Sequence, residues 1–110
     1  MRLKHKFGAK RCERDGIKFP SQLERGVFDM LKILEKQGKI RLIVRQFPFD
    51  LHGGLRHAVD FCVFTGEEVL FIEAKGRDLE AGKIRRQLAE SLNDVTIHVV
   101  KSPQEVLALF

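Results

Sequence analysis

Two carboxylates and a lysine, Asp60, Glu73 and Lys75, stand at spacings that could assemble a reactive site. The segment 65–68 is typical of a tight type II′ turn because Gly66 takes its first central position. Counting outward from this turn along two antiparallel strands places Asp60 opposite Glu73, with Cβ atoms about 4.5–5.5 Å apart. Lys75 lies two residues beyond Glu73 and therefore shares its face.

Facing carboxylates on a covered sheet repel each other unless a cation compensates their charge. A hard divalent cation such as Mg²⁺ or Mn²⁺ takes carboxylate oxygens as ligands. Such a cation ionises water and neutralises charge on a phosphate, and a neighbouring ammonium can stabilise the resulting oxyanion. Asp60, Glu73 and Lys75 therefore indicate metal-dependent phosphodiester hydrolysis. The alternative is a salt-bridge cluster in which Lys75 only neutralises Glu73 or Asp60.

Glu24 is a further candidate for the same site. On a helical wheel it falls between Leu31 and Phe28, inside the apolar arc, so a helix packed on the sheet would carry it toward the strand carboxylates. Ser21, three residues earlier, offers another explanation. The two residues could form a capping box in which Glu24 reaches back to the Ser21 N–H.

The elements that must position these residues follow from turn signals and apolar periodicity. Asp15-Gly16 predicts a hairpin, and Ser21 and Gly38 are start and stop signals for a helix. Pro48 indicates an edge strand or a bulge. The expected elements after the hairpin are a helix over 21–36, strands over 41–51, 56–64 and 68–75, a helix over 78–92, a strand over 95–101 and a short helix over 104–110.

The second expected helix begins with Asp78 as its cap and turns one apolar face inward, formed by Leu79, Ile84, Leu88 and Leu92. A mixed four-stranded sheet flanked by helices, an α/β fold, follows from this order. The 110 residues fit one domain. We divide it into a basic arm and hairpin over 1–19, a core over 20–101 and a C-terminal helix over 102–110.

Basic residues are concentrated at the N-terminus. Residues 1–18 contain seven Lys or Arg against two acidic residues, which accounts for the whole net charge of +5. A basic arm on a neutral body suits contact with nucleic-acid phosphates, and a solvated terminus is the alternative. We expect phosphate contacts from this arm and from the region around the second helix, namely Lys4, Lys6, Lys10, Arg11, Arg77, Lys83 and Arg86. For the helix, a solvated basic surface is the alternative.

The remaining composition is that of an intracellular protein. No apolar run approaches the roughly 20 residues of a membrane helix, and the basic N-terminus lacks the apolar stretch of a signal peptide. Cys12 and Cys62 form neither a metal-type spacing nor a disulfide framework. We therefore expect a reduced, cytoplasmic protein without membrane contact.

Asp60, twelve intervening residues and Glu73-Ala74-Lys75 resemble the PD-(D/E)XK nuclease superfamily, which includes restriction enzymes, Holliday-junction resolvases and many phage and repair nucleases. The expected order of elements is similar to the α-β-β-β-α-β, restriction-endonuclease-like core of that superfamily. The stretch DGIKFPSQLERGVFDMLKILEKQGKI, followed by RQFPF, also resembles small phage-borne members. Val59 departs from the pattern, because a proline would precede Asp60.

The resemblance implies a role for each matching position. Asp60 and Glu73 would bind Mg²⁺ or Mn²⁺ together with the backbone carbonyl of Ala74. Glu24 would be an additional or water-mediated ligand, and Lys75 would be the catalytic lysine.

Two glutamines are weaker candidates. Gln46 could approach the site from the neighbouring strand, although a polar residue at a ladder edge is commoner. Gln87 lies on the helix where some exonuclease-like members carry a functional glutamine, and an exposed helix glutamine is the alternative. His57 stands three residues before Asp60, so strict alternation places it on the opposite face, and we do not expect it in the site.

We therefore expect a magnesium-dependent endonuclease acting on DNA, including branched or structured DNA. A non-catalytic DNA-binding module of the same fold and an RNA-directed nuclease are the alternatives. A homodimer would be compatible with cutting two strands, but no interface can be identified from the sequence.

Overall fold

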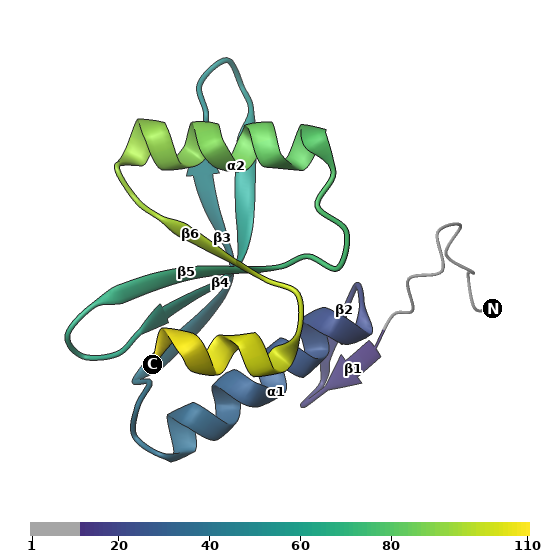
Figure 1. Ribbon diagram of the computed structural model, residues 1–110, viewed down its shortest axis with the longest axis vertical. Helices are drawn as coiled ribbons and strands as arrows, with labels where there is room; N and C mark the ends of the chain where they lie inside the picture. Colours follow the sequence, from purple (N-terminus) through teal and green to yellow (C-terminus); the bar gives the residue numbers. More distant parts are fainter. Residues whose placement is uncertain (1–11) are drawn as a thin grey trace.

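The structure is a computed structural model that describes residues 12–110. Figure 1 shows the arrangement of its elements. They are, in chain order, β1 (Cys12–Arg14), β2 (Ile17–Phe19), α1 (Gln22–Lys36), β3 (Leu42–Asp50), β4 (Arg56–Phe64), β5 (Val69–Ala74), α2 (Glu80–Asn93), β6 (Ile97–Val100) and the 3₁₀ helix η1 (Pro103–Leu109). The expected elements are all present, with η1 in place of the short final helix. Within residues 12–110, no helix combines the length and the hydropathy needed to cross a bilayer.

A mixed four-stranded sheet, in the order β3-β4-β5-β6, forms the centre of the fold. The β3–β4 and β4–β5 pairs are antiparallel, whereas β5 and β6 run parallel. Because β3 is an edge strand, it tolerates Pro48, as predicted. The order α1-β3-β4-β5-α2-β6 matches the predicted α-β-β-β-α-β core.

Local signals set the hairpin and the ends of α1. Asp15 and Gly16 both have positive φ, at 54° and 77°, as the tight turn between β1 and β2 requires. Ser21 Oγ accepts the Glu24 N–H at 3.1 Å, which caps the first turn of α1. Gly38, with φ at 82°, ends the helix region by donating its N–H to the Glu35 carbonyl. These predictions are confirmed.

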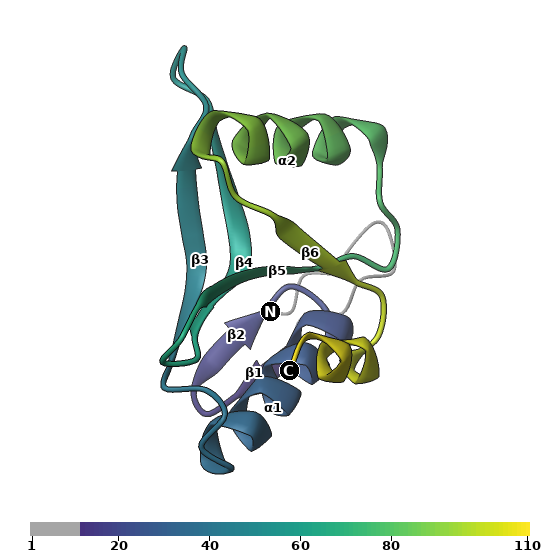
Figure 2. The same ribbon diagram turned by 60° about the vertical axis from the view of Figure 1, so that its left-hand side comes forward.

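The two faces of the sheet are covered differently. The hairpin, α1 and η1 lie on one face, and α2 lies on the other (Figure 1 and Figure 2). Gly26 lets α1 and η1 approach closely, because a Cβ at this position would lie 2.8 Å from Pro103 Cγ. The larger apolar cluster fills this side and includes Phe19, Val27, Phe28, Leu31, Phe61, Val63, Ile72 and Val106.

The orientation of α2 contradicts the sequence-based expectation. Its large apolar side chains face outward, with exposed fractions of 59% for Leu79, 56% for Ile84, 39% for Leu88 and 43% for Leu92. The buried residues of the helix are Arg86 and Ala89. Asp78 does not cap the helix either, because its carboxylate binds Arg86. Periodicity grouped the apolar residues on one face correctly, but the ion pair to Arg86 turns the other face toward the sheet.

Strand β4 changes the face on which its side chains pack at Asp60. Phe61 packs in the cluster beside α1, whereas Val59 packs in a second cluster beside α2. Regular alternation along a strand predicts that Val59 and Phe61, two residues apart, share a face, and the structure contradicts this. The cause lies in β3, where Gln46 has a φ of 53° and is missing from the β3–β4 ladder that continues on both sides of it. A left-handed residue within a strand interrupts regular alternation.

Candidate functional site

Two carboxyl groups from different elements meet beside the end of the β4–β5 ladder. The ladder has Phe61 opposite Ile72, which confirms the predicted register of β4 and β5, but it ends at this pair and does not include Asp60 and Glu73. The strands part there, and Asp60 Oδ2 accepts the Ala74 N–H at 2.9 Å. Glu24, on the first turn of α1, is buried and lies next to Asp60.

Glu24 and Asp60 affect each other's protonation. Burial, followed by the negative charge of Asp60, raises the pKa of Glu24 to about 7. Protonated Glu24 donates a hydrogen bond to Asp60. Burial also raises the pKa of Asp60, opposed by the Ala74 N–H and by the charge of Lys75. Two carboxyl groups this close cannot both ionise easily without a compensating cation.

Two basic residues border this carboxyl pair. Lys75 is half-buried, and its charge acts on Asp60, while its own N–H donates to the Val100 carbonyl at 3.0 Å. Arg45 of β3 donates to Glu24 Oε2 at 3.1 Å and lowers the pKa of that carboxyl. Lys75 was predicted here from the sequence, whereas Arg45 was not.

Arg45 also joins the hairpin to the site. Its guanidinium lies 4.4 Å from the centroid of the Phe19 ring, a cation–π distance. Phe19 is itself buried against Phe28 of α1. The only signal in the sequence for Arg45 is a basic residue among the apolar residues of a strand, which is equally typical of an exposed strand edge.

Glu73 is directed away from this pair, toward α2. Glu73 is 1% exposed, and its carboxylate contacts Nε2 of His57, a residue that we had placed on the opposite face. That placement of His57 is wrong because it assumed strict alternation through Asp60. Arg86 Nη1 lies 3.5 Å from Glu73 Oε2, and this oxygen is buried without a hydrogen-bond partner among the described residues.

The donor set fits a hard cation in part. Glu24 and Asp60 offer adjacent carboxyl oxygens at which a divalent cation could replace a proton. Glu73 Oε2 is a further acceptor without a hydrogen-bond partner among these residues. Across residues 12–110, however, no three His, Cys, Asp or Glu side chains are grouped closely enough to hold one ion. Completing the set would require Glu73 or the Ala74 carbonyl to join the pair.

The two glutamine candidates have different positions. Gln46 lies between Arg45 and Phe47, whose β4 partners flank Asp60, and its side chain lowers the pKa of Asp60 through a hydrogen bond. The strained backbone of Gln46 therefore coincides with a contact to the site. Gln87 is exposed on α2, as its alternative interpretation expected.

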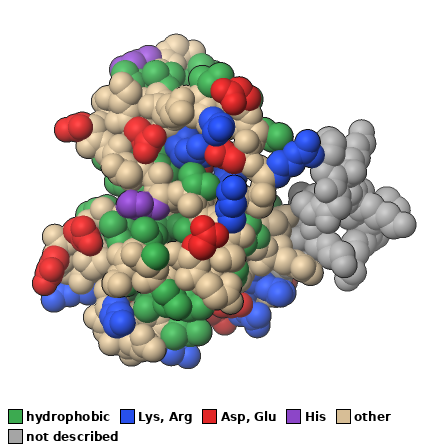
Figure 3. Space-filling model, in the orientation of Figure 1, with side chains coloured by type: hydrophobic (Ala, Val, Ile, Leu, Met, Phe, Trp, Pro, Cys, Tyr) green, Lys and Arg blue, Asp and Glu red, His purple; other side chains and the backbone are tan. Residues whose placement is uncertain are grey.

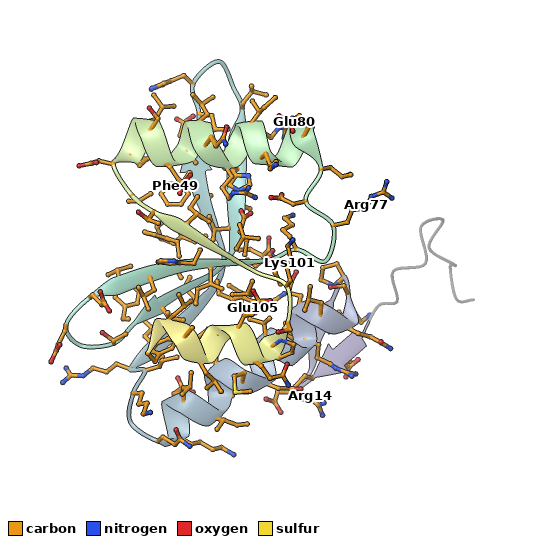
Figure 4. All side chains as sticks on the ribbon, viewed as in Figure 1. Arg14, Phe49, Arg77, Glu80, Lys101 and Glu105 are labelled. Carbon is orange, nitrogen blue, oxygen red and sulfur yellow. The ribbon has the colours of Figure 1, made fainter. Side chains whose placement is uncertain are left out.

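The basic residues predicted to contact phosphate are dispersed. Arg77 projects outward from the loop between β5 and α2 (Figure 4), and Lys83 is half-buried. Figure 3 shows Lys and Arg side chains interspersed with Asp and Glu over α2 and this loop. Arg86 is buried and held by Asp78, which argues against the direct phosphate contact predicted for it. Lys4, Lys6, Lys10 and Arg11 lie outside the described residues.

Comparisons of the chain with protein-family models, with curated proteins and with solved structures found no match.

Proposed function

We propose that the protein is a metal-dependent endonuclease that hydrolyses phosphodiester bonds in DNA. The observation that carries this proposal is the Glu24–Asp60 pair beside Lys75, in which Glu24 is buried, Asp60 is half-buried, and the pKa values of both carboxyl groups are raised. Buried carboxyls with raised pKa values are characteristic of functional sites. A structural ion pair would instead lower them.

The order of the elements supports the same proposal. Asp60 and Glu73 lie on adjacent strands, β4 and β5, and Glu24 lies on the helix that precedes them. The sequence resembles the PD-(D/E)XK motif at these positions, and the α-β-β-β-α-β order is consistent with it. We therefore propose a restriction-endonuclease-like identity for this core.

Each of these residues would have its own role in the site. Glu24, Asp60 and Glu73, with the Ala74 carbonyl, would hold Mg²⁺ or Mn²⁺. When bound, the cation supplies an ionised water and neutralises charge on the phosphate. Lys75 places an ammonium next to Asp60, where it can stabilise negative charge on the reacting phosphate.

Arg45 and the Ala74 N–H would orient the carboxylates. Arg45 holds Glu24 through Oε2, and the Ala74 N–H holds Asp60 through Oδ2. Both donors keep the carboxyl groups beside each other while leaving an oxygen of each available. Such preorganisation is what a reactive site requires of its supporting residues.

One observation favours a second candidate, a DNA-binding module without activity. Glu73 contacts His57 and Arg86 rather than the Glu24–Asp60 pair. If that contact were permanent, the third acidic residue would be structural.

A cleavage panel tests the proposal and separates the candidates. Supercoiled plasmid, linear duplex, a four-way junction and a single-stranded RNA are each incubated with protein in Mg²⁺ and in EDTA. We expect cleavage of DNA in Mg²⁺ only, and faster cleavage of the junction if branched DNA is preferred. DNA that is bound but never cut would support the binding module, and cleavage of RNA alone would support an RNA nuclease.

The matched variants are Glu73→Gln and Glu68→Gln. Both replace a glutamate near or within β5, but Glu68 is exposed at the hairpin turn. We expect Glu73→Gln to abolish cleavage and Glu68→Gln to cut at the wild-type rate. Equal rates for the two variants would remove Glu73 from the site.

A further inference from the structure

Strands β3 and β4 change the face on which they pack at the same point along the sheet. In β3, Ile43 packs with the cluster beside α1, whereas Phe47 packs with the cluster beside α2. Regular alternation would place these two residues on one face. Strand β4 makes the same change between Phe61 and Val59. Gln46 lies at this point, with a φ of 53° and no place in the β3–β4 ladder, so one residue of β3 accompanies the change in both strands.

This change of face decides which acidic residue Asp60 meets. Regular alternation beyond the end of the β4–β5 ladder would direct Asp60 to the same face as Glu73, toward α2. Glu73 does point toward α2, whereas Asp60 meets Glu24 of α1. The Glu24–Asp60 pair therefore depends on the departure from regular alternation at Gln46.

The backbone of Gln46 has a conformation that a glutamine rarely adopts. A residue with a Cβ is strained in the left-handed region, and strain of this kind is concentrated at functional sites. Glycine would take the same conformation without strain, so the backbone at this point does not by itself require a glutamine. What the glutamine adds is its amide. From an exposed position on the edge strand β3 (Figure 2), this amide donates a hydrogen bond to the Asp60 carboxylate.

Resting on the proposed function, we infer that Gln46 is a positioning residue for Asp60. Its left-handed backbone turns Asp60 toward α1, and its amide holds the carboxylate there beside Glu24. Arg45, the preceding residue of β3, donates to Glu24 Oε2 at 3.1 Å, so two consecutive residues hold the two members of the pair. Displacing a reactive group by about 1 Å can lower turnover by about 100-fold, so Gln46 affects the reaction without contacting DNA.

The variants separate the backbone of Gln46 from its amide. Gln46→Val removes the amide and also disfavours the left-handed backbone, because a β-branched residue is an outlier there. Gln46→Gly removes only the amide, since glycine accepts the conformation. Asp94→Val is the matched control for strain, because Asp94 has a φ of 51° at the exposed end of α2.

The position of Asp60 can be measured without metal or DNA. Hydrogen exchange in EDTA is followed at the Ala74 N–H, whose acceptor is Asp60 Oδ2 at 2.9 Å. The Lys75 N–H is the internal reference, because it donates to the Val100 carbonyl instead. The melting temperature is measured in the same buffer, and kcat and KM on plasmid are measured in Mg²⁺.

We expect the Ala74 N–H of Gln46→Val to exchange about 10–100-fold faster relative to the Lys75 N–H, as for the loss of a hydrogen bond to a charged group. Its kcat should fall about 100-fold with KM for DNA unchanged. Gln46→Gly should melt no lower than the wild type, keep the Ala74 N–H protected and lose about tenfold in kcat. Asp94→Val should melt lower, with the exchange ratio and kcat of the wild type.

A wild-type exchange ratio and kcat in folded Gln46→Val would overturn the inference. If that variant does not fold, a wild-type kcat in Gln46→Gly would overturn it instead. A wild-type protein that never cuts DNA would overturn the proposed function, and the exchange ratio in EDTA would still decide whether Gln46 positions Asp60.

Discussion

Glu24 of α1 and Asp60 of β4 are joined by a hydrogen bond between their carboxyl groups, although 35 residues separate them in the chain. Burial and the charge of Asp60 raise the pKa of Glu24 to about 7, so the pair retains a proton that two ordinary carboxyls would have lost. This relationship connects the acid–base behaviour of the fold to the proposed chemistry, because a proton and a divalent cation would compete for the same oxygens.

The stability of the metal-free protein should depend on pH through Glu24. Its folded pKa of about 7 exceeds the ordinary value of 4.5, so the folded state binds the proton more tightly. The resulting stabilisation is present below pH 4.5 and is lost as the pH rises through 7, by on the order of 3 kcal/mol. We predict that the melting temperature in EDTA falls between pH 5 and pH 8, and that Glu24→Gln removes most of this fall. If the melting temperature fell equally with pH in the wild type and in Glu24→Gln, the assignment would be contradicted.

Arg45 should oppose the effect of burial on the pKa of Glu24. Its hydrogen bond and charge both lower that pKa, so Arg45→Met should raise the pKa of Glu24 further above 7. Titration of the carboxyl carbons by NMR measures the shift directly. Arg41→Met is the control, because Arg41 is exposed just before the same strand. An equal titration curve for Glu24 in both variants would show that Arg45 does not act on it.

Features encoded by neighbouring residues could be predicted from the sequence. The Asp15-Gly16 hairpin, the Ser21 cap and the pairing of β4 with β5 each depend on a few consecutive residues. The burial of Glu24 also followed from its place in the apolar arc of α1. These features appear in the structure as predicted because the backbone geometry of a turn or a cap is determined by neighbouring residues.

Features that depend on packing between distant elements could not be predicted. The positive φ of Gln46 in β3 accompanies the change of face between Val59 and Phe61 in β4. No sequence pattern predicts this positive φ. The direction of Glu73 follows from that change and from Arg86. In α2, the periodicity of the apolar residues could not decide which face of the helix meets the sheet. The face that does so carries Arg86, whose partners Glu73 and Asp78 come from β5 and from the loop before α2.

The outward face of α2 should tolerate polar replacement. Ile84 and Leu88 are largely exposed, so Ile84→Gln and Leu88→Gln should each change the free energy of unfolding by less than about 0.5 kcal/mol. Leu31→Ala in α1 is the contrast, because Leu31 is fully buried and its truncation should cost about 2–5 kcal/mol. Urea denaturation measures all three. A destabilisation at Leu88 comparable to that at Leu31 would show that the α2 leucines are buried.

The N-terminal arm should supply sequence-independent affinity for DNA. Replacing Lys4, Lys6, Lys10 and Arg11 by alanine should weaken duplex binding and reduce its salt dependence. The log–log slope should decrease by up to about 0.9 for each phosphate that the arm no longer neutralises. Fluorescence anisotropy in Ca²⁺ across a salt series gives the slope. An unchanged slope would assign phosphate binding to other basic residues, such as Arg77 and Lys83.

Nicking of supercoiled plasmid in Mg²⁺ by wild type, Asp60→Asn and Asp94→Asn tests the central claim most directly. Asp94 is the matched control, because it is exposed at the end of α2 and its left-handed backbone suits asparagine equally well. We predict that wild type and Asp94→Asn nick the plasmid at the same rate, and that Asp60→Asn, folded and still able to bind DNA, falls to the background seen in EDTA. Nicking by Asp60→Asn at the wild-type rate would contradict the account.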